Sequence, residues 1–205
     1  MLEIVQGEGG VLPLTEEFVQ AAYALAQEKD IPLIIDEVQT GNGRTGKLYG
    51  YMHFGITPDI VSTAKGLGGG LPIGATMLGD KVQNVLGPGD HGSTYGGNPV
   101  CCAGALSVMQ RLDDALMTQV QEKSQYIFSQ LEGAEGVISV AGMGLMIGIE
   151  TQRPARDVVM DCMEKGVLCL TAKNKVRLLP ALNIPMDTLA QAIEILKEAI
   201  KKPSP

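Results

Sequence analysis

The sequence has little of what marks membrane proteins, disulfide-rich proteins and zinc proteins. Its longest apolar runs, such as residues 31–35, fall far short of the roughly 20 residues that a membrane-spanning helix needs. The four cysteines show no paired Cys-x-x-Cys spacing, and only two histidines are present. A disulfide framework or a metal site is therefore a poor interpretation, and we expect a cytoplasmic protein with reduced thiols.

Basic residues are also in short supply. The chain has 16 Lys and Arg against 23 Asp and Glu, a formal net charge of −7. Because nucleic acids are bound through clustered Lys and Arg, this balance argues against a nucleic-acid partner. With 45% hydrophobic and 19% charged residues, the composition is that of a globular protein with a sizeable core. We expect small-molecule partners, and neither nucleic acid nor membrane.

Three common motifs are absent. No Gly-x-x-x-x-Gly-Lys-Ser/Thr loop occurs, and the glycine run at residues 66–70 does not match the dinucleotide fingerprint Gly-x-Gly-x-x-Gly after a strand. The pattern Gly-x-Ser-x-Gly is not met at Ser93 or elsewhere, which removes the usual nucleophile elbow of α/β-hydrolases.

What is present first is a β-α-β pattern. Residues 2–5 have the pattern of a buried strand, and the apolar run that opens residues 33–38 is continuous, typical of a strand buried on both faces. Between them Thr15 is a suitable N-cap for a helix that extends to Lys29. Such a unit predicts a parallel sheet. Further elements are expected as strands at 59–64 and 74–78 and as a helix at about 99–116.

The rest of the chain has a different order of elements. A helix is followed by β structure at 137–150, a helix near 155–165, strands at 167–170 and 176–179, and a terminal helix from Met186. This order is typical of a small α+β domain after an α/β core. We therefore predict two domains, residues 1–116 and 117–205.

Asp36 and Glu37 follow an apolar run at the carboxyl end of a predicted strand, where open α/β sheets bind their ligands. A functional acid fits that place. The same pattern is the Walker B segment of ATPases, but that interpretation needs the phosphate-binding loop that the sequence lacks. A strand-end cap or a salt bridge is the structural alternative for Asp36.

Lys65 directly follows an apolar strand and precedes a run of glycines. Glycine is used where the backbone must approach a ligand closely. A lysine that is desolvated at such an edge can act as a Schiff-base nucleophile. The alternative is a surface lysine at the start of a loop, the commoner fate of a single lysine.

Two further segments are candidates for binding anions. Residues 91–99 combine hydroxyls, exposed amides and a following helix, which suits a phosphate. Arg177 stands in an otherwise apolar strand, where an arginine either pairs with an acid or binds a carboxylate. Glu8 is a possible partner, and an edge-strand arginine that faces water is the alternative.

Taken together, these segments resemble the class-III (ω-amino) aminotransferases of fold type I, because several long motifs occur in the family's order. The motifs lie at residues 6–10, 35–41, 43–46, 58–60, 64–66, 68–75 and 91–99. Residues 44–51 and 176–182 are most similar to the family members that use N-acetylornithine. The resemblance implies part of a parallel-sheet large domain that binds the cofactor pyridoxal 5'-phosphate, followed by a small α+β domain.

The resemblance also implies roles for single residues. Lys65 would bond the cofactor and act as general base, and Asp36 would keep the cofactor's ring nitrogen protonated. Val38 would pack on the ring and Gln39 would bind its phenolic oxygen. Thr94, with Ser93, would contact the phosphate of the partner subunit's cofactor in a homodimer with shared active sites.

Arg177 would bind the α-carboxylate of glutamate and 2-oxoglutarate, with Glu8 as its gate. The implied reaction takes N-acetyl-L-ornithine and 2-oxoglutarate to N-acetyl-L-glutamate 5-semialdehyde and glutamate, in arginine biosynthesis. Ornithine, succinylornithine or 4-aminobutyrate are alternative donors. The resemblance covers the later half of such an enzyme, and a strand pattern starts at Met1. We therefore expect residues 1–205 alone to be a poor catalyst or an inactive fragment.

Overall fold

The computed structural model describes residues 1–202, which fall into two compact units. Unit 1 consists of Met1–Ile4, Leu14–Gly43 and Lys47–Asp114. Unit 2 consists of Val5–Pro13, Arg44–Gly46 and the chain from Ala115 onward. Two stretches that the sequence analysis places in the first domain, residues 5–13 and 44–46, thus pack in unit 2. None of the helices within residues 1–202 is long and apolar enough to cross a membrane.

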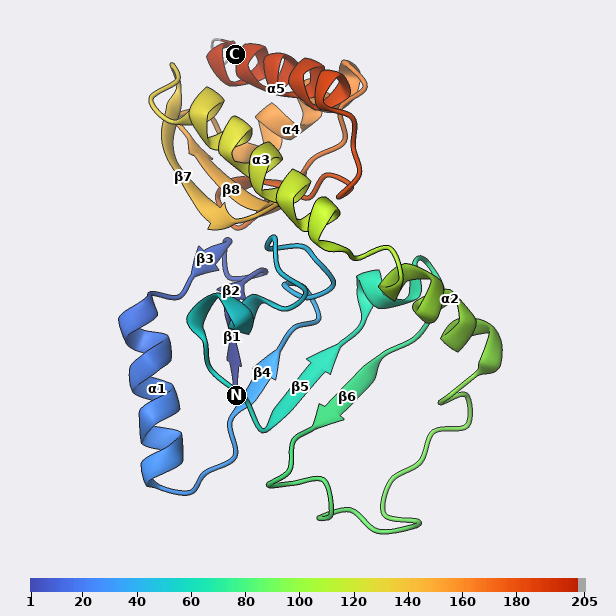
Figure 1. The fold of residues 1–205 in the computed structure, drawn as a ribbon. Coiled ribbons are helices and arrows are strands. Elements are labelled where there is room, and N and C mark those ends of the chain that lie inside the picture. Colours follow the sequence, from blue (N-terminus) through green and yellow to red (C-terminus); the bar gives the residue numbers. More distant parts are fainter. Residues whose placement is uncertain (203–205) are drawn as a thin grey trace. The chain divides into compact units, whose positions relative to one another are not determined.

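Unit 1 is built on a four-stranded sheet (Figure 1). The strand order is β1 (Leu2–Glu3), β4 (Ile34–Asp36), β5 (Ile60–Thr63) and β6 (Ala75–Leu78). The first three strands are parallel, as predicted, whereas β6 is antiparallel to β5. The short connection from β5 to β6 explains this, because a parallel crossover needs a dozen or more residues.

The predicted helix after the first strand is confirmed as α1 (Glu16–Glu28), and the Thr15 hydroxyl caps it by accepting from the Phe18 amide at 3.2 Å. The single helix expected at 99–116 is wrong. It is two helices, α2 (Pro99–Met109) and α3 (Asp114–Leu131). The Arg111 and Leu112 amides bond carbonyls only three residues back, and such tight turns end an α-helix.

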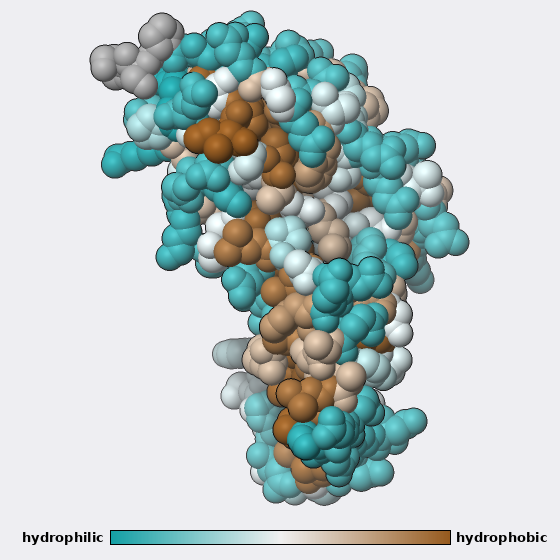
Figure 2. Space-filling view, turned by 90° about the vertical axis from the view of Figure 1, so that its left-hand side faces the viewer, coloured by the Kyte–Doolittle hydropathy of each residue, from teal (hydrophilic) through white to brown (hydrophobic). Residues whose placement is uncertain are grey.

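Apolar side chains remain on the surface of unit 1. All four residues of the edge strand β6 are exposed, and on α1 Phe18 and Leu25 are about half exposed. Figure 2 views the side on which α1 lies and shows apolar patches among polar residues. Exposed apolar side chains that gather in patches favour association with another chain.

Unit 2 is an antiparallel sheet with three helices (Figure 1). The strand order is β7 (Val137–Met143), β8 (Met146–Thr151), β10 (Lys175–Leu178) and β9 (Leu170–Ala172). Helices α3, α4 (Ala155–Glu164) and α5 (Met186–Lys201) share one hydrophobic core with this sheet. The strand expected at 167–170 begins later because residues up to Val167 complete the end of α4, whose Cys162 carbonyl accepts from the Val167 amide.

The opening strand expected at residues 2–5 is divided between two sheets. Leu2–Glu3 pairs with β4, whereas Val5–Gln6 forms β2, which pairs with β3 (Leu12–Pro13) in a hairpin of unit 2. The hairpin lies against the sheet at Gly148, where a Cβ would be only 2.8 Å from the Cβ of Val11. A side chain at position 148 would therefore push the hairpin away from the sheet.

Candidate active site

Asp36 and Lys65 lie at one edge of the unit 1 sheet. Asp36 is the last residue of β4, and in the parallel pairing of β4 with β5 it stands opposite Ser62. Lys65 follows the end of β5 by two residues. Since the carboxyl ends of parallel strands meet at the same edge, the sheet brings these two residues to the place where open sheets bind ligands.

Asp36 is half-buried and organises the turn that follows it. Its Oδ1 accepts a hydrogen bond from the Val38 amide at 3.0 Å, which closes a short turn. Val38 and Gln39, the two residues that the resemblance places around the cofactor ring, lie in this turn and are half-buried. The cap expected as the alternative for Asp36 is thus present, and it uses one carboxylate oxygen.

Glu37 points into the interior and anchors the same turn. Its fully buried carboxylate accepts from the Thr40 hydroxyl at 2.6 Å and from the amides of Gly50 and Tyr51 at 2.9 and 2.8 Å. Burial raises the pKa of Glu37, and these three hydrogen bonds oppose that rise. Glu37 therefore ties the end of β4 to the short 3₁₀ helix η1 (Gly50–Phe54).

Lys65 opens the 3₁₀ helix η2 (Lys65–Gly68) with a φ of 46°, a conformation that residues other than glycine adopt rarely. Such backbone strain is found preferentially at functional sites. The side chain of Lys65 is exposed, so the desolvation that the sequence suggests is not found among the described residues.

Sequence reasoning missed two polar residues beside Lys65. The side-chain amide of Asn42 donates to the Thr63 hydroxyl at 3.0 Å and to the Ala64 carbonyl at 3.2 Å. Its Oδ1, and the Oγ of Ser62, are buried and have no hydrogen-bond partner within residues 1–202. Only the position of Ser62 three residues before Lys65 hinted at a role, and a single asparagine in a glycine-rich loop carries no such signal.

The segment expected to bind phosphate is an exposed loop before α2. Ser93 and Thr94 are exposed, and the Ser93 carbonyl accepts from the Gly96 amide at 3.2 Å. Asn98 caps α2 by accepting from the amides of Val100 and Cys101. The hydroxyls of Ser93 and Thr94 are thus open to a partner from outside the unit.

Arg177 and Glu8 form the ion pair that the sequence suggested. Arg177 lies on β10, where it pairs with Gly148 of β8. Its side chain is on the face of the unit 2 sheet that is turned away from the helices. The β2–β3 hairpin, whose loop contains Glu8, packs on this face. Arginine Nη1 donates to glutamate Oε1 at 2.9 Å. The Arg177 side chain is 10% exposed, whereas that of Glu8 is 77% exposed. The arginine Nε is buried without a hydrogen-bond partner in the described part of the chain.

Comparison with known proteins identifies the family. The sequence pattern described as "Aminotransferase class-III" matches residues 1–200. The chain belongs to the class-III aminotransferases.

Individual members of the family are similar along the whole chain. An acetylornithine aminotransferase of Haemophilus ducreyi is 48% identical over 204 residues, which cover 98% of this chain and 52% of that protein. Two solved structures match closely. The N-acetylornithine aminotransferase from Stenotrophomonas maltophilia gives a TM-score of 0.87 at 33% identity, and the Plasmodium falciparum ornithine δ-aminotransferase gives 0.89 at 35%. They cover 98% and 97% of this chain and 55% and 54% of their own chains. The chain spans about half the length of the curated relatives it matches.

The polar groups at the edge of the unit 1 sheet can be compared with the cofactor of the family. Class-III aminotransferases depend on pyridoxal phosphate, which presents an aldehyde, a ring nitrogen and a phenolic oxygen. The amine of Lys65, the carboxylate of Asp36 and the amide of Gln39 are complementary to these groups. The unpartnered, buried hydroxyl of Ser62 opposite Asp36 leaves one polar atom at this edge for a bound group. The residues present therefore fit the cofactor.

Proposed function

We propose that this class-III aminotransferase chain takes part in the transfer of an amino group from N-acetyl-L-ornithine to 2-oxoglutarate, in arginine biosynthesis. The products are N-acetyl-L-glutamate 5-semialdehyde and glutamate. The observation that carries the proposal is the edge of the unit 1 sheet, where adjacent parallel strands present Asp36 and Lys65 together.

The choice of donor is supported by the relatives. The acetylornithine aminotransferase of Haemophilus ducreyi is 48% identical to this chain over 98% of the chain's length. Ornithine, succinylornithine and 4-aminobutyrate are the competing donors.

The chemistry of the site is divided among four residues of the chain. The bound cofactor supplies an electron sink for the carbon that carries the substrate's amino group. Asp36 holds a proton on the ring nitrogen, since a carboxylate beside that atom favours its charged form. Lys65 would hold the cofactor through its amine, and the same amine would serve as the base that moves a proton at the reacting carbon. Val38 and Gln39, fixed by the turn after Asp36, orient the ring.

The proposal extends to the whole enzyme. Ser93 and Thr94 contact the cofactor phosphate of the partner subunit, so that the working unit is a homodimer, and the location is cytoplasmic. Their exposure before the N-terminus of α2 supports such a contact. We assign residues 1–116 to the large cofactor-binding domain and residues 117–205 to the small C-terminal domain.

Arg177 binds the α-carboxylate of glutamate and of 2-oxoglutarate, and Glu8 occupies it when the acetylated donor is bound. The ion pair at 2.9 Å supports the occupied state, and the exposure of Glu8 supports its release. Planar, bidentate binding of a carboxylate is the interaction for which arginine is best suited.

Replacing Arg177 with alanine should act on one half-reaction. The half-reaction with glutamate or 2-oxoglutarate should slow at least about tenfold more than the one with N-acetylornithine, because only the former needs the free guanidinium. Single-turnover absorbance measurements on the two half-reactions would show this. Arg156→Ala, an exposed arginine on α4, is the matched control and should change neither. Equal losses in both half-reactions would rule out the gate.

A panel of amino donors tests the proposed function itself. The protein as its gene encodes it should be supplied with pyridoxal phosphate, 2-oxoglutarate and one of the four donors at a time. We expect the highest kcat/KM with N-acetylornithine. A higher kcat/KM with ornithine, succinylornithine or 4-aminobutyrate would show that this compound, and not N-acetylornithine, is the donor. If no donor gives glutamate, the proposed function is wrong.

A further inference from the structure

The segment that follows Arg177 is held by two cations from distant parts of unit 2. Arg44 Nη1 donates to the Pro180 carbonyl at 2.6 Å and to the Leu145 carbonyl at 3.1 Å. Lys123 Nζ donates to the Leu182 carbonyl at 2.7 Å. These carbonyls belong to the connection between β10, which carries Arg177, and α5. Both cations therefore grip the chain within five residues of Arg177.

Arg44 is held in place by its own backbone. Its carbonyl accepts from the Leu145 amide at 2.9 Å, and the Gly46 carbonyl accepts from the side-chain amide of Gln121 on α3 at 3.1 Å. At Gly144, which has a φ of 57°, a Cβ would lie 2.5 Å from the Arg44 carbonyl oxygen. The motif Gly-Arg-Thr-Gly at residues 43–46, to which the proposed function gives no role, thus places a guanidinium in unit 2.

Lys123 is an unusual residue for its position. Its side chain lies on the buried face of α3 beside Val120 and Ile127, and the residue is 4% exposed. Burial lowers the pKa of Lys123, as expected for a desolvated ammonium. A leucine there would pack without that cost, so the charge indicates a task other than filling the core.

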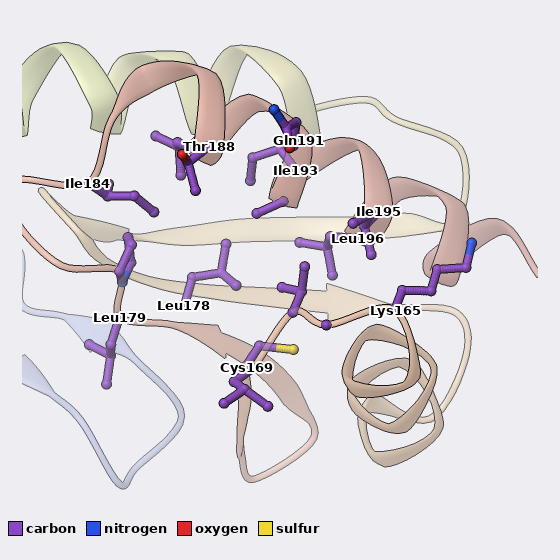
Figure 3. A pocket seen from close by; sticks show the side chains of 16 residues that line it. Lys165, Cys169, Leu178, Leu179, Ile184, Thr188, Gln191, Ile193, Ile195 and Leu196 are labelled. Atoms are coloured by element: carbon purple, nitrogen blue, oxygen red, sulfur yellow. The ribbon is translucent and has the colours of Figure 1, made fainter.

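One side of the connection between β10 and α5 is not closely packed. A cavity of about 410 Å³ is lined by Leu178, Leu179, Pro180 and Ile184 together with residues of α5. Figure 3 shows Leu178 and Ile184 together with Ile193 and Leu196 of α5 in the lining of this cavity. Close packing normally holds a loop in one position. Because a cavity lies on one side of this connection, its position depends more on hydrogen bonds.

We propose that Arg44 and Lys123 are positioning residues that set where Arg177 meets the carboxylate of its substrate. The inference rests on the proposed function, in which Arg177 binds glutamate and 2-oxoglutarate. Arg177 is the next-to-last residue of β10, and the strand ends at Leu178. The two cations hold the Pro180 and Leu182 carbonyls of the chain that follows, and so fix the end of the strand that carries the guanidinium.

The test compares Lys123→Met, which keeps the length of the side chain without its charge, with Lys123→Arg, which keeps a donor. In the protein as its gene encodes it, Lys123→Met should raise the KM for 2-oxoglutarate about tenfold, because a charge-assisted hydrogen bond is lost. The KM for N-acetylornithine should change less than about twofold, since that half-reaction does not use the free Arg177. Lys123→Arg should recover most of the loss.

Two further variants complete the experiment. Arg44→Lys keeps the charge but not the fork that reaches two carbonyls, and should raise the KM for 2-oxoglutarate about threefold even if Lys123→Met does not fold. Lys165→Met removes a lysine whose side chain is 48% exposed and should leave both KM values unchanged. Thermal unfolding of each variant separates a change of stability from a change of position.

The outcomes distinguish the inference from the proposed function. If Lys123→Met and Arg44→Lys raise both KM values equally, or lower only the thermal stability, the cations are structural and the inference is wrong. If Arg177→Ala affects the glutamate half-reaction selectively while these variants do not, the proposed function stands and this inference alone fails. If Arg177→Ala is not selective, both fail.

Discussion

Replacing Lys65 with alanine should reduce transamination by roughly 10²–10⁴-fold, the contribution of a positioned general base. In the proposed function Lys65 has two tasks, attachment of the cofactor and movement of a proton, and a neighbouring group would have to take over both. Its strained backbone at the end of β5 places the amine at the sheet edge, where Asp36 also lies. The measurement is kcat with saturating N-acetylornithine, 2-oxoglutarate and cofactor.

Lys29→Ala is the matched control, because Lys29 is an exposed lysine of unit 1 that pairs only with the adjacent Glu28 in the ion pairs of the described chain. It should retain full activity. Retention of more than about half of the activity by Lys65→Ala would show that the nucleophile and base lie elsewhere.

Asp36→Asn should cost roughly 10²–10³-fold in kcat, comparable with the loss of one preorganised electrostatic group at a reacting centre. The asparagine can still accept from the Val38 amide, so the turn should survive, but it cannot hold a proton on the ring nitrogen by its charge. Steady-state kinetics of the variant, together with circular dichroism to confirm the fold, provide the check.

Asp80→Asn, a change at an exposed aspartate of unit 1, should leave kcat unaffected. The competing interpretation of Asp36 as a Walker-type ligand has a distinct outcome. Magnesium-dependent ATP hydrolysis in the parent protein that disappears in Asp36→Asn would favour an ATPase and overturn the assignment.

Much of the fold could be predicted because its signals are local. The buried strands at β4 and β5 and the capped helix α1 are visible as an apolar run or as Thr15 before an amphipathic stretch. Two predictions failed, the undivided opening strand at residues 2–5 and the single helix at residues 99–116. Nothing at Ile4 indicates that the chain changes sheets, because the pairing of distant strands depends on tertiary contacts. The break after α2 is a pair of tight turns at Arg111 and Leu112, and residues 110–113 contain no glycine or proline that would mark it in the sequence.

The candidate site likewise contains residues that the sequence indicates and residues that only the structure shows. Asp36 and Lys65 could be suspected from strand ends alone, and Arg177 from a charge in an apolar strand. Glu37 could not be separated from Asp36 by sequence, because which of two adjacent carboxylates faces inward depends on the pleat of the strand. Lys123 looks like an ordinary helix lysine in the sequence, and only its burial and its bond to Leu182 distinguish it.

Peptide mapping can show whether Lys65 is the residue that attaches pyridoxal phosphate. The protein as its gene encodes it is incubated with the cofactor, treated with borohydride and digested, and the pyridoxyl-labelled peptide is sequenced by mass spectrometry. We expect the label on Lys65, within the peptide that contains Ala64 and Gly66, and we expect it to be lost in Lys65→Ala. A label retained at stoichiometric level on any other lysine, with Lys65 unmodified, would contradict this assignment.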